Sequence, residues 1–169
     1  EENGTSGRPA STLDEFWAYG AHSDAYRPGA VLNMMLGNHD FVRYGDLLQR
    51  GRLAEPDEEA WWARHRLAFL VQAAYSGSIT RYYGEEIGDE VPGFDQKVGG
   101  DCALLGLCDD HVARSSAKIS GVTVTEDQLA AQQKELLQFH RDLMALRDRY
   151  ASLSRGDRQH LYSDNGLYV

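Results

Sequence analysis

The sequence lacks any excess of positive charge and any long apolar run. Its 169 residues include 26 acidic and 17 basic side chains, and the formal net charge is −9. Nucleic acids and anionic membrane surfaces attract Lys and Arg, so this charge argues against both as partners. No apolar stretch approaches the roughly 20 residues that a membrane-spanning helix needs. These absences favour a globular protein that binds a neutral or cationic ligand.

Cysteine is scarce as well. The two that occur, Cys102 and Cys108, lie in one Gly-rich stretch. A short disulfide and two free thiols are both compatible with their spacing. The first residues, EENGTSGRPASTLDE, are polar and show none of the apolar core of a signal peptide. The cellular location is therefore left open.

What is present is an alternation of helix and strand patterns. A helix is expected to begin at Ser11 or Thr12, and the apolar run AVLNMMLG predicts a buried strand over Val31–Leu36. The segment that follows, including YGDLLQR, has the pattern of a polar loop. A second helix is expected from about Asp57 to Tyr75, and a second strand over Ile79–Tyr83.

The remainder of the chain contains one long loop, one helix and one turn. Residues 84–123 are rich in Gly and Asp and predict a loop of unusual length. Thr125 and Gln128 have the spacing of a capping box, which predicts a helix from there to about Tyr150. Asn165 and Gly166 stand between apolar pairs and predict a hairpin turn.

Helices that alternate with buried strands predict an α/β fold with parallel strands. In such folds, the loops after the carboxyl ends of the strands carry the functional site. Asn38, His39 and Asp40 come directly after the first predicted strand, and YYGEE holds the equivalent place on the second. The sequence therefore predicts a polar site at that end of the strands.

Four stretches of the chain resemble one protein family in the family's own order. LGNHDFVR is similar to the Asn-His-Asp block that follows the seventh barrel strand of the alpha-amylase superfamily, glycoside hydrolase family 13. YYGEEIG resembles the family's block at the eighth strand, and LLQFHRDLMALRDRYASLSRG resembles its eighth helix. YSDNGLYV resembles the first strands of the C-terminal β-sandwich. The resemblance begins at about residue 12 and continues to the end of the chain.

This resemblance implies a fold and a division into domains. The fold class is α/β, a partial TIM (β/α)8 barrel made of the seventh and eighth strands with their flanking helices. Residues 1–155 would form the C-terminal quarter of the catalytic barrel. Residues 156–169 would form the first strands of the C-terminal β domain.

The resemblance also implies roles for individual residues. Asp40 matches the aspartate that stabilises the transition state, which is cationic and favoured by a fixed carboxylate. His39 matches a histidine that binds the same sugar, and Asn38, Arg43 and Tyr83 are expected to help to bind substrate. Glu85 is interpreted as structural. These residues require no metal and no cofactor, and a structural calcium stays open for parts of the protein outside this sequence.

The two other carboxylates that such chemistry needs are missing. In the family, the nucleophile and the general acid come from the fourth and fifth strands, and only 33 residues precede Met34 here. A full barrel takes about 250 residues. The chain is therefore interpreted as a fragment of a retaining α-glycosidase or transglycosylase that acts on α-linked glucans or glucosides, inactive by itself. Its macromolecular partner would be the missing barrel portion or a second copy.

One alternative belongs to another class of function. Some amylase-like proteins, such as transporter heavy chains, keep the barrel as a non-catalytic interaction module. Such relatives often degrade the Asn-His-Asp block, which is intact at residues 38–40 and favours the enzyme. Linkage specificity, and the choice between hydrolysis, transfer and isomerisation, depend on loops that this sequence does not contain.

Overall fold

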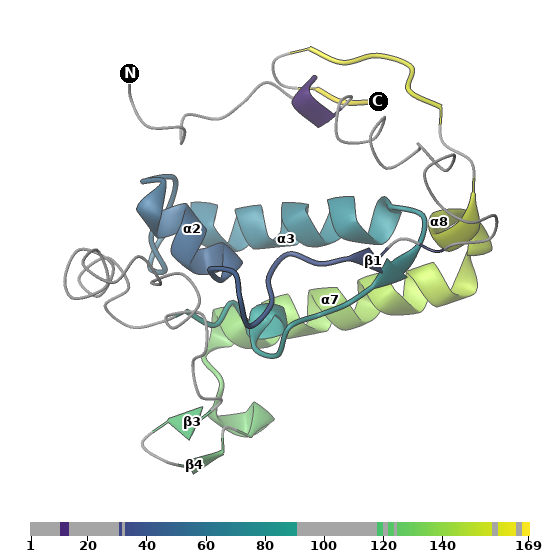
Figure 1. Cartoon of the computed structure of the whole chain (residues 1–169). Coiled ribbons are helices and arrows are strands. Elements are labelled where there is room, and N and C mark those ends of the chain that lie inside the picture. Colours follow the sequence, from purple (N-terminus) through teal and green to yellow (C-terminus); the bar gives the residue numbers. More distant parts are fainter. Residues whose placement is uncertain are drawn as a thin grey trace.

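The structure is a computed structural model. It describes residues 11–13, 31, 33–90, 118–119, 122–123, 125–156, 159–164 and 167–169. Its α-helices are α2 (Tyr44–Arg50), α3 (Glu59–Ala74), α7 (Ala131–Arg149) and α8 (Ala151–Arg155). The described residues also form two 3-10 turns, η2 (Glu85–Ile87) and η3 (Glu126–Gln128) (Figure 1). Most of the helix predicted to begin at Ser11 or Thr12 lies outside the described residues.

Two short strands pair in parallel. In β1 (Asn33–Met34) and β2 (Ser78–Ile79), Asn33 is opposite Ser78 and Met34 is opposite Ile79. The amide of Thr80 extends the ladder by donating to the Met34 carbonyl at 2.9 Å. The prediction of parallel neighbours joined by a helix is confirmed, although both strands are shorter than the apolar pattern indicated.

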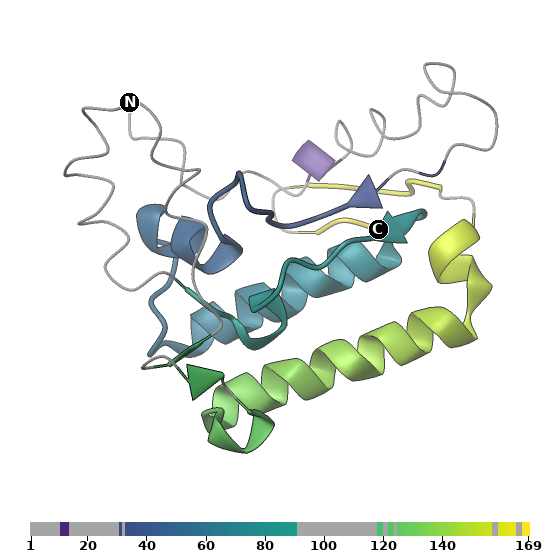
Figure 2. The ribbon, with the colours of Figure 1, turned by 60° about the horizontal axis from the view of Figure 1, so that its bottom comes forward.

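Helix α3 follows the face predicted from its sequence. Trp61, His65 and Phe69 repeat every four residues and are fully buried. This face of α3 packs against side chains of α2 and α7. The buried core consists of Leu48, Ala54, Trp61, Trp62, Phe69 and Leu136. Figures 1 and 2 show α3 and α7 side by side, with the strand pair along them.

Helix α2 was expected to be a loop, and that expectation is wrong. The helix has seven residues and no side-chain cap at its start, so the local sequence gives little indication of it. Tertiary packing holds it instead, because Leu48 and Asp46 are buried. A Cβ placed on Gly45 would lie 2.5 Å from the Trp61 ring, so only glycine allows this approach.

Helix α7 begins later than the capping box predicted. The box exists, because the Gln128 side chain accepts from the Thr125 amide at 2.9 Å, but it closes only η3. Leu129 then adopts extended backbone and is buried, which interrupts the helix. The Gln133 side chain accepts from the Ala130 amide at 3.0 Å, and α7 starts at Ala131.

Two hairpin-like pairings lie outside this body. Strands β3 (Lys118–Ile119) and β4 (Val122–Thr123) pair antiparallel inside the segment that was expected to be a loop. Ser163 and Tyr168 form an antiparallel bridge on either side of the predicted Asn165–Gly166 turn, which itself lies outside the described residues. Among the residues described, no helix is long and apolar enough to cross a membrane.

Candidate active site

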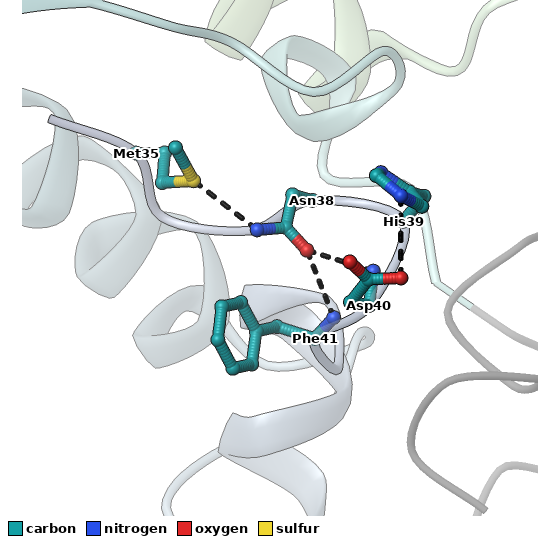
Figure 3. Close-up of polar contacts among 5 residues, drawn as sticks. All are labelled: Met35, Asn38, His39, Asp40 and Phe41. Carbon is teal, nitrogen blue, oxygen red and sulfur yellow. Dashed lines mark hydrogen bonds and ion pairs between the residues drawn. The ribbon is translucent and has the colours of Figure 1, made fainter. Parts of the chain in front are cut away.

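The loop after β1 is shaped by Asn38. Its Oδ1 accepts from the amide of Asp40 at 2.7 Å and from the amide of Phe41 at 3.1 Å (Figure 3). Its Nδ2 donates to the sulfur of Met35 at 3.2 Å. A side chain that binds its own backbone in this way fixes a turn. Asn38 therefore sets the position of the backbone that carries Asp40.

His39 and Asp40 present their side chains together at the tip of this loop. Nε2 of His39 lies 3.2 Å from Oδ1 of Asp40, and the side chains are 65% and 55% exposed. Figure 3 shows the two side by side, with the ring of Phe41 pointing away from them. An exposed pair of this kind contributes little to stability. It does offer a carboxylate and an imidazole to the hydroxyl groups of a ligand.

Arg43 is fully buried and joins this loop to the segment after β2. Its Nη1 donates to the carbonyl of Tyr83 at 2.7 Å, and its Nη2 lies 3.5 Å from the carboxylate of Asp89. The guanidinium also lies 4.8 Å from the ring centre of Tyr82 and 4.9 Å from that of Tyr83. The structure thus brings Arg43 and Tyr83 together, with Tyr83 41% exposed.

Glu85 lies under the same loop and was not among the predicted site residues. It is 1% exposed, and its Oε1 accepts from the amide of Tyr44 at 3.4 Å. Burial raises the pKa of this carboxyl, the Tyr44 amide, Arg43 and Arg81 oppose the rise, and Glu86 adds to it. The YYGEE pattern was the available sequence indication, but its contact partner could not be predicted from it.

The segment after β2 depends on glycine for its path. Gly84 and Gly88 flank η2 with φ angles of 88° and 64°, in the left-handed region that glycine adopts without strain. This path directs Glu85 inward beneath the first loop. Asp40 and Glu85 are therefore at the same end of the strand pair, as the prediction of parallel strands implied.

No metal centre is evident in the part of the chain that the structure describes. There, no group of three or more His, Cys, Asp or Glu side chains could hold a metal ion. Cys102 and Cys108 lie outside the described residues.

A parallel α/β unit with polar loops at its carboxyl end defines the class of protein, and comparison with solved structures identifies the family. The chain belongs to the alpha-amylase superfamily, glycoside hydrolase family 13. It is 49% identical to a variant of AmyP in complex with maltotriose, over 99% of this chain and 33% of that one, with a TM-score of 0.83. It is 50% identical to AmyP in complex with maltose, over 95% and 31% of the two chains, with a TM-score of 0.81.

A more distant structure shows the same fold. The alpha-amylase from Geobacillus thermoleovorans, complexed with acarbose, is 22% identical, over 92% of this chain and 27% of that one, with a TM-score of 0.63. The chain spans about a third of the length of the AmyP structures. Comparisons with protein-family profiles and with curated proteins found no match.

Proposed function

We propose that this chain supplies the last part of the catalytic barrel of a retaining enzyme that acts on α-linked glucans or glucosides. In this proposal, β1 and β2 are the seventh and eighth barrel strands, and residues 156–169 begin the C-terminal β domain. The observation that carries it is the exposed pair of His39 and Asp40 at the carboxyl end of β1, on a turn that Asn38 closes. The chain matches about a third of AmyP. Crystal structures show AmyP in complex with maltose and a variant of it in complex with maltotriose.

The chemistry follows from the charge of the transition state. Cleavage of a glycosidic bond passes through a species that resembles an oxocarbenium ion. The carboxylate of Asp40 would stabilise this positive charge more than it stabilises the neutral sugar, which lowers the barrier. His39 would donate to a hydroxyl of the same sugar and hold it in place. The nucleophile and the general acid would come from other parts of the enzyme.

The other predicted residues would act at different distances from the sugar. Asn38 supports Asp40 through the backbone, and Tyr83 offers a partly exposed ring to the ligand. Arg43, which is fully buried here, would orient Tyr83 through its carbonyl and its ring. None of these roles requires a cofactor.

The experiment is the substitution Asp40→Asn in the full-length enzyme. The amide keeps the size and much of the hydrogen bonding but removes the negative charge, so we expect kcat on maltotriose to fall by at least about 100-fold. Steady-state kinetics measure this, and thermal unfolding serves as the control for folding. Turnover at the wild-type rate would refute the role of Asp40. A full-length wild type that binds maltotriose and never cleaves it would support the non-catalytic alternative.

A further inference from the structure

One buried carboxylate supports both ends of the loop that carries Asp40. The loop segment Gly37–Tyr44 begins three residues after β1 and ends at the first residue of α2, and both of its end residues lie against Oε1 of Glu85. We propose that Glu85 is a positioning residue that sets the place of Asp40 relative to the bound sugar. This inference rests on the function proposed above and adds a residue to it.

The contact at Gly37 leaves no room for a side chain. A Cβ at this position would lie 2.6 Å from Oε1 of Glu85 and 3.6 Å from its carboxyl carbon. The φ of Gly37 is not among the positive values, so the backbone itself would accept alanine. Glycine is needed here because the loop lies directly on the carboxylate. The length of the Glu85 side chain therefore sets how far Gly37 lies from the segment after β2.

The contact at the other end of the loop is a hydrogen bond. Oε1 of Glu85 accepts from the amide of Tyr44, the first residue of α2. The first amides of an α-helix have no partners inside the helix. Arg43 is the N-cap residue of α2, and its side chain makes no capping hydrogen bond. Glu85 thus takes the place of a capping residue from 41 positions along the chain. Asp40 is held between these two attachment points, four residues from the second.

A carboxylate at this position must lose its hydration, and an apolar side chain of similar size would avoid this unfavourable free energy. Glu85 is 1% exposed, and desolvation of a carboxylate is unfavourable. The charged side chains that act on it are Arg43, Arg81 and Glu86. Arg43 also binds the carbonyl of Tyr83 at 2.7 Å, so the same cluster holds the adjoining loop. A carboxylate retained at such a cost is better explained by the position that it imposes than by stability alone.

The first test compares two glutamates in the full-length enzyme. We expect Glu85→Gln to lower kcat on maltotriose by about 10- to 100-fold with little change in KM, because a displaced transition-state stabiliser affects the chemical step. Glu135→Gln makes the same change at an exposed glutamate of α7 and should retain kcat. Arg147→Lys controls for destabilisation, because Arg147 of α7 binds backbone carbonyls away from this loop and its replacement is expected to lower stability.

The second test restores the fit by changing both sides of the contact. Gly37→Ala should lower kcat, because its methyl group would displace the loop from Glu85. Glu85→Asp shortens the carboxylate by one methylene, so the double variant Gly37→Ala/Glu85→Asp should be more active than the two single losses combined predict. Combined losses that simply add would overturn the proposal, as would a wild-type kcat for Glu85→Gln.

The same assays separate this inference from the proposed function. If Asp40→Asn abolishes turnover while Glu85→Gln and Gly37→Ala retain it, the function stands and the role of Glu85 is wrong. If Asp40→Asn also retains turnover, the proposed function itself fails. Should Glu85→Gln not fold, the comparison of Gly37→Ala with the double variant still decides the matter.

Discussion

His65 is a buried histidine whose ionisation would oppose folding. It is fully buried among aromatic rings, with Nδ1 2.9 Å from the Trp61 carbonyl and the ring of Tyr44 edge-on at 5.1 Å. Burial lowers its pKa to about 4, and the bond to Trp61 opposes this. Since the unfolded histidine takes up a proton near pH 6.5, acid favours the unfolded chain.

We therefore expect stability to fall as the pH drops below about 6.5 towards 4. Above the unfolded pKa the contribution is fully present, and its loss amounts to on the order of 3 kcal/mol for full protonation of one such group. His140, whose pKa burial lowers to about 4 with a further contribution from Arg81, acts in the same direction. Thermal unfolding of the full-length protein between pH 7 and 5 measures the effect.

Two variants test whether His65 is responsible. His65→Phe fills the site without a titrating group, so its unfolding midpoint should depend less on pH over this interval. His160→Gln, at an exposed histidine, should keep the wild-type dependence. An equally steep dependence in His65→Phe would contradict the assignment.

At the scale of single residues, the sequence indicated the exposed site better than its support. Asn38, His39 and Asp40 are adjacent in the chain, so one motif predicted them together. The contacts of Arg43 with Tyr83 and of Glu85 with Gly37 join residues more than 35 positions apart. No local pattern specifies which buried carboxylate lies beneath a loop, because that depends on how the two strands place their ends.

At the scale of elements, Arg147 of α7 joins three segments. It lies within hydrogen-bond distance of the carbonyls of Ala73 (2.5 Å), Tyr75 (2.7 Å) and Leu153 (2.8 Å), and it also donates to the carbonyl of Gly77. The carbonyls at a helix end have no partners inside the helix, so Arg147 completes the end of α3. It also holds the turn that leads into β2.

We expect Arg147→Lys to destabilise the full-length protein by about 2–4 kcal/mol, because the single ammonium of a shorter side chain cannot reach both the carbonyls at Nη1 and the Gly77 carbonyl at Nη2. Chemical denaturation measures the change. Arg149→Lys, two residues along the same helix and exposed, should leave the free energy of unfolding within about 0.5 kcal/mol of the wild type. Similar effects of the two substitutions would show that Arg147 is not the joint between these segments.

The same scale explains which elements could be predicted. Helix α3 has 16 residues and a clear buried face, so its periodicity was sufficient. Helix α2 has seven residues and is held by Trp61 and the core, which a local pattern cannot show. The start of α7 was misplaced because the same Thr and Gln spacing suits a single 3-10 turn, and the burial of Leu129 decided the outcome.

At the scale of the whole molecule, the described residues expose surface that a barrel would cover. Beside the start of β2 there is a groove of about 720 Å³, lined by residues of β2, α7 and α8 that include Ser78, Met144 and Arg155. On α3, Leu67 is 60% exposed and Leu70 is 45% exposed, one helical turn apart. Val31, just before β1, is 67% exposed. In the proposed barrel, neighbouring strands and helices would cover such surfaces.

We expect that this 169-residue chain, expressed alone, is not a compact monomer. At about 25 cal/mol per Å², exposing a few hundred Å² of apolar surface costs on the order of 5–10 kcal/mol, which is comparable with the stability of a whole domain. The edges of the parallel pair would also favour pairing with other strands. A second copy, or the missing barrel portion supplied as a separate chain, should therefore associate with it. Light scattering with intact-mass analysis tests this expectation, and a monodisperse species of 18.9 kDa with cooperative unfolding would contradict it.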